Sequence, residues 1–419
     1  MDREVLVYVD LNDVPYLVGR LWARTRKNKE GATFEYDARW LEHRERFSLE
    51  PALTLGPGPF HTPTDTPMFG AIGDSAPDRW GRALMRRMER RRAEREKQTP
   101  RTLQEIDYLL QVDDETRQGA LRFAGTEGGP FLREEGAKRT PALLELPALL
   151  SAAERVADDK DTEDDLRLLL APGSSLGGAR PKASVRDKDG HLAIAKFPRQ
   201  DDDYNTVLWE AVALTLARKA GIPVPDARVE TVGNKPVLVL RRFDRRDGHR
   251  IPFLSSMSML DARDNQTRSY MELADALRQH GAAAKDDIRA LWRRIVFTVL
   301  ISNTDDHLRN HGFLYEGPTG WRLSPAYDLN PVPVDIKPRI LTTAINEDDN
   351  TASLDLAMSV APYFELDEAR ARAAVGDVAR AVATWRDEAA RHGLSKQETA
   401  RMASAFEHAD LPAALAFNR

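Results

Sequence analysis

The spacing of apolar residues divides the chain into a strand-rich part, up to about residue 246, and a helix-rich remainder. Three early segments alternate between apolar and polar positions, as half-buried strands do; they cover residues 5–11, 16–22 and 32–36. A strand from Lys182, an Asp189-Gly190 turn and the strand HLAIAKFP predict a hairpin. Residues 224–245 hold two more strands, and GFLYEGPTGWRLS predicts a last hairpin around a Gly-Pro turn.

Apolar residues spaced three and four apart predict the helices. These are expected over residues 74–96, 144–156, 205–219, 270–278 and 286–301, and throughout the tail from 366 to 419. A capping box of Thr102 and Glu105 predicts a further helix through Leu110. The sequence therefore predicts an α+β protein with an N-terminal subdomain (1–110), a β-rich lobe (111–243) and a mainly helical lobe (244–419).

Two stretches stand out by charge. The helix that ends near Glu96 holds the densest positive charge of the chain, in RWGRALMRRMERRRAEREKQTPR. Its interspersed glutamates favour a solvated helix face, and the alternative is a docking surface for an acidic partner or for DNA phosphates. The acidic stretch AERVADDKDTEDD, residues 153–165, is expected on the surface.

Composition sets outer limits on the class of protein. A chain of 419 residues is long enough for two or three domains, and 42% apolar with 30% charged residues is typical of a soluble globular protein. The absence of cysteine excludes disulfides, thiolate metal sites and Cys nucleophiles. A net charge of −5 argues against a protein that wraps nucleic acid by itself. Neither a secretory signal nor a membrane-spanning stretch is evident, so a cytoplasmic location is expected.

Candidate chemistry is concentrated between residues 302 and 328. Asp305 precedes Asn310 by five positions, and Asp328 follows the predicted last hairpin. Phosphoryl transfer needs a carboxylate that orients the attacking hydroxyl, and an Asn and an Asp that hold magnesium on the phosphates. The protein-kinase catalytic loop has the same Asp-to-Asn spacing. The alternative is a capped loop, because Asn and Asp are ordinary turn residues.

Two further features strengthen the interpretation as a kinase. The Gly-rich segment APGSSLGGARPKASV, residues 171–185, opens a hairpin, as do the loops that kinases lay over nucleotide phosphates. Lys196 lies in the strand that follows, and Glu210 lies in the most apolar part of the next helix. A buried glutamate needs a partner, and Lys196 is the economical choice. Each feature is weak alone, but their order along the chain is that of a kinase.

These motifs resemble the HipA family of serine/threonine kinases, the toxins of bacterial toxin–antitoxin modules. The resemblance rests on SSLGGARPKASV, AIAKFP, VPDARV, RRFDR, NTDDHLRNHGF and SPAYDLNP, and it extends to GAIGDSAPDRWGR near the N-terminus. It implies a two-lobed kinase-like fold that uses ATP and Mg²⁺. It also implies a protein substrate such as an aminoacyl-tRNA synthetase, and a small helix-turn-helix antitoxin through which DNA is contacted.

The resemblance assigns roles to individual residues. Asp305 matches the catalytic Asp, and Asn310 and Asp328 match the magnesium ligands. The expected nucleotide-binding residues are Gly177, Gly178, Lys182, Lys196, Glu210, Arg242, Phe243, Asp244 and His307. Autophosphorylation is expected in the Gly-rich loop at Ser175, with Ser174 as the rival acceptor. Asp306 and Arg241 depart from the family pattern, which has a small residue and an acidic residue there.

Two alternatives remain open at the level of sequence. A small-molecule or lipid kinase can carry the same D-x-H-x-x-N loop, although the SSLGGARPK segment argues against it. The other alternative is an inactive kinase fold that acts as the corepressor of a DNA-binding partner. The presence of Asp305, Asn310, Asp328 and Lys196 argues for catalysis.

Overall fold

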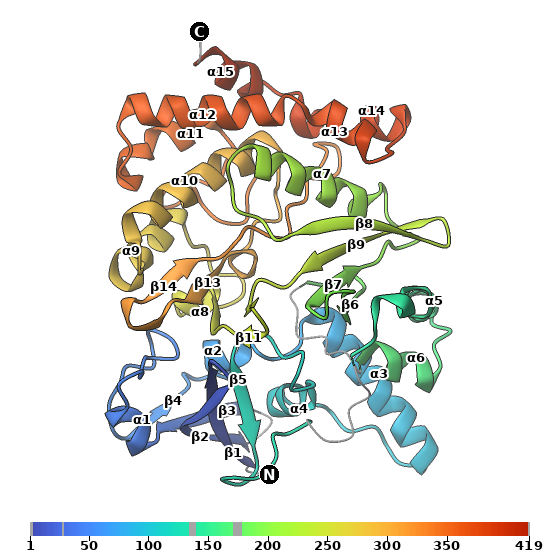
Figure 1. The fold of residues 1–419 in the computed structure, drawn as a ribbon, viewed down its shortest axis with the longest axis vertical. Coiled ribbons are helices and arrows are strands. Elements are labelled where there is room, and N and C mark those ends of the chain that lie inside the picture. Colours follow the sequence, from blue (N-terminus) through green and yellow to red (C-terminus); the bar gives the residue numbers. More distant parts are fainter. Residues whose placement is uncertain (1–2, 27–28, 134–139, 171–177, 418–419) are drawn as a thin grey trace. The chain divides into compact units, whose positions relative to one another are not determined.

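The computed structural model describes residues 3–26, 29–133, 140–170 and 178–417 (Figure 1). By their internal contacts the residues form two compact units. Unit 1 comprises Met1–Gln200 and Thr231–Leu254, and unit 2 comprises Asp201–Glu230 and Ser255–Arg419. The three predicted domain ranges stay predictions. Ser174, Ser175 and Gly177 lie outside the described residues.

Unit 1 begins with a five-stranded sheet in the order β4-β3-β2-β1-β5. Its strands are β1 (Arg3–Leu11), β2 (Val14–Arg26), β3 (Lys29–Tyr36), β4 (Pro59–His61) and β5 (Leu121–Ala124). Asn12 and Asp13 join β1 to β2 with φ of 54° and 64°, which these two residue types tolerate better than others. The first three strands were predicted, and each is longer at its N-terminal end than its alternation indicated.

The helices of unit 1 are α1 (Ala38–Glu42), α2 (Gly70–Gly73), α3 (Arg79–Glu96), α4 (Glu105–Gln111), α5 (Leu146–Ala157) and α6 (Glu163–Leu170), with a short η1 (Leu143–Glu145). The predicted capping box at Thr102 is wrong. The N-cap of α4 is Gln104, whose backbone N–H donates to the Asp107 carboxylate at 2.9 Å. Thr102 therefore lies two residues too early to cap this helix.

Several arginines of α3 form ion pairs within unit 1. Arg82 pairs with Glu105, Arg87 with Asp161 at 2.5 Å, and Arg95 with Glu163 at 2.5 Å. Because these acids belong to α4, to α6 and to the segment before α6, the charge of α3 stabilises helix packing. The prediction of a wholly exposed acidic stretch is wrong at Asp161, which is 5% exposed.

A second sheet has the order β6-β7-β9-β8. Its strands are β6 (Lys182–Arg186), β7 (Leu192–Lys196), β8 (Ala227–Val232) and β9 (Lys235–Arg241), and the short strands β10 (Arg245–Arg246), β11 (His249–Arg250) and β12 (Phe253–Ser255) follow. Apolar side chains of β6 and β7 share one buried cluster with α3, α5 and α6. The opposite face carries Lys182, Ser184, Ile194 and Lys196, because alternate residues of a strand point to opposite faces.

Unit 2 is mainly helical. Its helices are α7 (Thr206–Lys219), α8 (Ser256–Met259), α9 (Tyr270–His280), α10 (Ala284–Leu300), α11 (Leu354–Ser359), α12 (Glu368–Val382), α13 (Trp385–Arg391), α14 (Lys396–Phe406) and α15 (Asp410–Ala416). α12 packs against α7, α10 and α15. The predicted hairpin is present as β13 (Gly312–Tyr315) and β14 (Trp321–Leu323), joined through η3 (Gly317–Thr319). None of the described helices has the length and apolarity needed to span a membrane.

Candidate active site

Helix α10 leads the chain into the loop that holds the predicted catalytic residues. All five residues of its predicted apolar face are 0% exposed: Ile288, Leu291, Trp292, Ile295 and Val299. The helix stops where Ser302 takes a left-handed conformation with φ of 51°. The Ser302 hydroxyl donates to the carbonyl of Ala405 at 2.8 Å. The loop therefore starts from a fixed point in the core of unit 2.

The two adjacent aspartates of this loop have opposite environments. Asp305 is exposed, whereas Asp306 is 1% exposed. The Asp306 carboxylate accepts hydrogen bonds from the Tyr270 hydroxyl at 2.7 Å and from the Thr342 N–H at 2.6 Å. Its backbone carbonyl accepts from the Thr343 hydroxyl at 2.7 Å. Asp306 thus anchors the loop from inside, which leaves the Asp305 carboxylate as the one presented to solvent.

Asn310 closes the catalytic loop on itself. Its side-chain Nδ2 donates to the backbone carbonyl of Asp305 at 2.7 Å, so the five-residue spacing corresponds to a direct contact. The Asn310 N–H donates to the carbonyl of His307 at 2.8 Å, in the short helix η2 (Leu308–Asn310). With Nδ2 occupied in this way, Oδ1 is the atom of Asn310 suited to a cation.

Asp328 follows the hairpin β13–β14 and is held beside the same loop. The hydroxyl of its neighbour Tyr327 donates to the carbonyl of Arg309 at 2.8 Å. Asn330 donates from its N–H to Asn303 Oδ1 at 3.3 Å and from Nδ2 to the Asp328 carbonyl at 3.2 Å. Asp328 itself takes a left-handed conformation with φ of 52°, which aspartate tolerates better than most residues.

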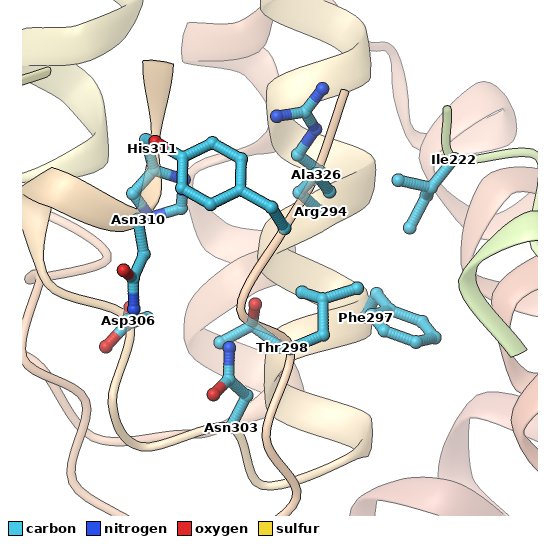
Figure 2. A pocket seen from close by; sticks show the side chains of 11 residues that line it. Ile222, Arg294, Phe297, Thr298, Asn303, Asp306, Asn310, His311 and Ala326 are labelled. Atoms are coloured by element: carbon cyan, nitrogen blue, oxygen red, sulfur yellow. The ribbon is translucent and has the colours of Figure 1, made fainter. Parts of the chain in front are cut away.

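A small pocket lies beneath the catalytic loop (Figure 2). It is lined by residues of α10, of the loop, of the segment after β14 and of the segment after α7: Ile222, Arg294, Phe297, Thr298, Asn303, Asp306, Asn310, His311, Ala326, Tyr327 and Leu329. Burial governs its electrostatics. It raises the pKa of Asp306 to about 6, lowers the pKa of His311 to about 3 and lowers the pKa of Arg294 to about 10. At neutral pH, His311 is therefore uncharged and Arg294 is charged.

The two histidines of the loop have different surroundings, and of the two only His311 lines the pocket. His311 contacts the Tyr270 hydroxyl through Nε2 at 3.3 Å, and that hydroxyl also donates to Asp306. His307 is half-buried, and its Nδ1 has no hydrogen-bond partner among the residues that the structure describes. An unpaired buried nitrogen is costly, so a ligand or a water that satisfies it would be favoured.

The nucleotide-binding residues predicted in unit 1 fall into two groups. Gly178 and Lys182 lie before and at the start of β6, and Lys196 ends β7 directly opposite Lys182. Arg242 and Asp244 are buried and bound to each other, with Nη2 to Oδ2 at 2.5 Å. Their side chains also contact residues 116–119, so both support the fold of unit 1.

The other two predicted residues have different surroundings. Phe243 packs against Phe253, with ring centroids 6.4 Å apart. Glu210 is 5% exposed on α7 in unit 2, whereas Lys196 belongs to unit 1. The ion pair between Lys196 and Glu210 stays a prediction. Sequence reasoning missed Tyr270, Arg294 and His311, since no local motif marks a residue whose role depends on distant partners.

The oxygen donors at the loop fit a magnesium ion. Asn310 and Asp328 offer one amide and one carboxylate, and kinase sites complete the coordination of Mg²⁺ with waters and phosphate oxygens. The donor set therefore suits a metal that arrives with a nucleotide.

Comparison with known proteins agrees with this geometry. Residues 174–385 match the family model described as the HipA-like C-terminal domain. A putative kinase of Haemophilus influenzae is 26% identical over 195 residues, which is 41% of this chain and 56% of that protein. The putative kinase Y4dM of Sinorhizobium fredii is 28% identical over 218 residues, 44% of this chain and 52% of that protein. The matches thus span about half the length of these relatives.

A solved structure extends the likeness to the whole fold. The HipA of Shewanella oneidensis, solved with HipB and operator DNA, aligns over 99% of this chain and 96% of its own, with a TM-score of 0.65 and 18% identity. The predicted α+β fold is confirmed by this match. Since the family model covers half of the chain, including the catalytic loop, this protein belongs to the HipA family.

Proposed function

We propose that this protein is an ATP- and Mg²⁺-dependent kinase that phosphorylates a serine or threonine of another protein. The observation that carries the proposal is the anchored loop: Asp305 is exposed, Asn310 bonds back to its carbonyl, and Asp306 fixes the loop from below. A carboxylate that must orient a hydroxyl needs a rigid backbone and an open approach. The names of the curated relatives, putative kinases, support the same activity.

In the proposed reaction, the Asp305 carboxylate accepts a hydrogen bond from the substrate hydroxyl and directs its oxygen at the transferred phosphoryl group. Asn310 and Asp328 hold magnesium. MgATP supplies the phosphoryl group and the cation that neutralises charge as it develops. Lys196, paired with Glu210, faces the phosphates in this proposal. The other residues proposed to line or support the nucleotide site are Gly177, Gly178, Lys182, Arg242, Phe243, Asp244 and His307.

The proposal extends to partners. Because the matching Shewanella structure contains HipA, HipB and operator DNA, we propose a small helix-turn-helix antitoxin as partner here, with DNA reached mainly through it. The proposed target is a cytoplasmic protein of the aminoacyl-tRNA synthetase class. A pull-down with the purified chain, followed by binding of the captured protein to DNA with and without the chain, tests the partnership.

The activity is tested by transfer of a labelled γ-phosphate from ATP. The full chain should label protein in a cell extract when Mg²⁺ is present, and Asp305→Asn should abolish the labelling. Labelling of a small metabolite or a lipid in place of protein would establish the alternative kinase class. If the wild type binds MgATP but neither transfers nor hydrolyses it, the kinase activity is refuted and the corepressor alternative stands.

Self-phosphorylation of the Gly-rich loop is part of the proposal. A phosphate on Ser175 would add about −1.5 to −2 charges next to those of the nucleotide, and repulsion should then weaken nucleotide binding. Mass spectrometry after incubation with MgATP compares wild type, Ser174→Ala, Ser175→Ala and Asp305→Asn. Phosphate should appear on Ser175 in the wild type and in Ser174→Ala, but not in Asp305→Asn. Equal phosphate in Asp305→Asn would contradict self-phosphorylation.

A further inference from the structure

The N-terminus of α3 meets the point where the chain leaves the Gly-rich loop. Asp78 is the N-cap of α3, and its Oδ1 accepts from the Gly81 N–H at 2.8 Å. The other carboxylate oxygen, Oδ2, accepts from Lys182 Nζ at 3.0 Å. The side chains of Lys182 and Asp78 are 4% and 6% exposed. One carboxylate thus caps a helix and neutralises a buried lysine 104 positions away.

Trp80, in the first turn of α3, holds the same segment through backbone groups. Its indole N–H donates to the Lys182 carbonyl at 3.0 Å, and its backbone N–H points to the Gly178 carbonyl at 3.4 Å. The ring belongs to the apolar cluster that α3 shares with β6 and β7. Residues 178–182 are therefore fixed at both ends by α3.

Gly178 fits this arrangement for a steric reason. Its φ of +111° is unfavourable for other residues, and a Cβ built there would lie 2.8 Å from Lys182 Nζ. The ammonium group therefore packs against the bare backbone of the loop. A larger residue at position 178 would force the Lys182 ammonium group to shift.

Charge explains why Asp78 is needed. Lys182 and Lys196 are direct cross-strand partners in β6 and β7, so both side chains leave the sheet on the same face. Like charges directly opposite each other are destabilising, and a buried ammonium without a counter-ion is more costly still. The ion pair with Asp78 removes most of that cost at Lys182.

We propose that Asp78 is a positioning residue of the nucleotide site. It neutralises Lys182 and fixes residues 178–182, so that the Gly-rich loop starts from a rigid base and Lys196 is the lysine that meets the phosphates. The nucleotide part of this inference rests on the proposed function. The fixing of the loop base by α3 does not, and it is tested separately.

The loop base is tested by hydrogen exchange on the full chain without nucleotide. Asp78→Asn and Asp78→Ser both keep an N-cap residue and remove the charge. Asp367→Asn, at the N-cap of α12, is the matched control. Peptides covering residues 178–186 should exchange faster in both Asp78 variants and stay unchanged in the control. Unchanged exchange in that segment would overturn the inference.

The nucleotide site is tested by titration with MgATP and by steady-state kinetics. Asp78→Asn should weaken MgATP binding about tenfold, with a matching rise in KM for ATP and kcat within about twofold. Because Asp78 acts through Lys182, Asp78→Asn combined with Lys182→Met should lose no more than Lys182→Met alone. Wild-type affinity in Asp78→Asn, or additive losses in the double variant, would overturn the positioning role.

The two proposals fail in different ways. If the wild type does not bind MgATP, the proposed function is refuted. The hydrogen-exchange experiment still decides whether Asp78 fixes residues 178–182. If the wild type binds and transfers phosphate but Asp78→Asn behaves like the wild type in both assays, the kinase stands and the inference about Asp78 is wrong.

Discussion

At the residue scale, the adjacent aspartates show how burial separates two identical side chains. The sequence presents Asp306 as an added negative charge beside the predicted catalytic residue. In the structure its carboxylate is directed inward, to Tyr270 and to the N–H of Thr342. Tyr270 lies 36 positions before Asp306 and Thr342 lies 36 positions after it, so no local sequence pattern could predict these contacts. The D-x-x-x-x-N spacing could be recognised in the sequence because Asp305 and Asn310 contact each other within one loop.

Asp305 and Asp328 should be separable by their effects on ligand binding. Asp305→Asn is expected to lose phosphoryl transfer by a factor of about 10² or more while MgATP binds normally, because this carboxylate would orient the hydroxyl only. Asp328→Asn should instead lose the Mg²⁺ dependence of nucleotide binding. Calorimetric titration with ATP, with and without Mg²⁺, measures nucleotide binding by both variants, and transfer of a labelled γ-phosphate measures their activity. Full transfer activity in Asp305→Asn together with loss in Asp306→Asn would shift the catalytic role to Asp306.

The ionisation of Asp306 should be visible in stability. Burial raises its pKa in the folded state from the ordinary value of 3.8 to about 6, so between these values the folded state binds more protons than the unfolded state. Stability from this group is therefore complete below about pH 4 and is lost as the pH rises through 6, by up to about 3 kcal/mol. Urea unfolding of wild type and Asp306→Asn from pH 4 to 7.5 measures the difference.

The comparison with Asp306→Asn is necessary because His311 titrates in the opposite sense. Its pKa is lowered to about 3, so its contribution to stability is lost as the pH falls below its unfolded value of about 6.5. That contribution is common to both proteins and largely cancels in the difference. A pH-independent difference between the wild type and Asp306→Asn would contradict a raised pKa of Asp306.

At the element scale, local signals predicted most of the helices and strands. Helix α7 was predicted over residues 205–219; it begins after its N-cap Asn205, whose side chain accepts from the Leu208 N–H, and ends at Lys219 as expected. The two alternatives for α3 could not be separated by sequence, since both predict the same exposed positive charge. The ion pairs of Arg82 with α4 and of Arg95 with α6 are a third role that neither alternative included, and they depend on how the helices pack.

The packing role of α3 can be measured by removing one arginine. Arg87→Met should lower the free energy of unfolding by about 1–3 kcal/mol, because it leaves the buried carboxylate of Asp161 with only a distant contact to Arg91. Arg90, exposed on the same helix and without an ion pair to any described residue, provides the control. Arg90→Met should change the free energy by less than about 0.5 kcal/mol. Equal effects in urea unfolding would contradict a specific role for the pair.

At the scale of the whole molecule, the chain passes between the two units three times, after residues 200, 230 and 254. Helix α7 follows β7 in sequence, yet it packs against α12 and α13. Sequence order could not reveal this, because an apolar helix face does not specify which other face covers it. The consecutive motifs Lys196 and Glu210 accordingly lie in different units, although the sequence joins them by a short segment.

The assignment of α7 to unit 2 predicts where a core mutation acts. Trp209 on α7 is 0% exposed, and its ring centroid lies 6.1 Å from that of Trp385 and 6.0 Å from that of Phe406. Trp209→Ala should cost about 3–5 kcal/mol and speed hydrogen exchange in α12, α13 and α14. Trp40→Ala, at a 1% exposed position of unit 1, should speed exchange near β2 and α1 instead. Faster exchange confined to β6, β7 and β9 in the Trp209 variant would show that α7 is stabilised mainly by the sheet that precedes it in sequence.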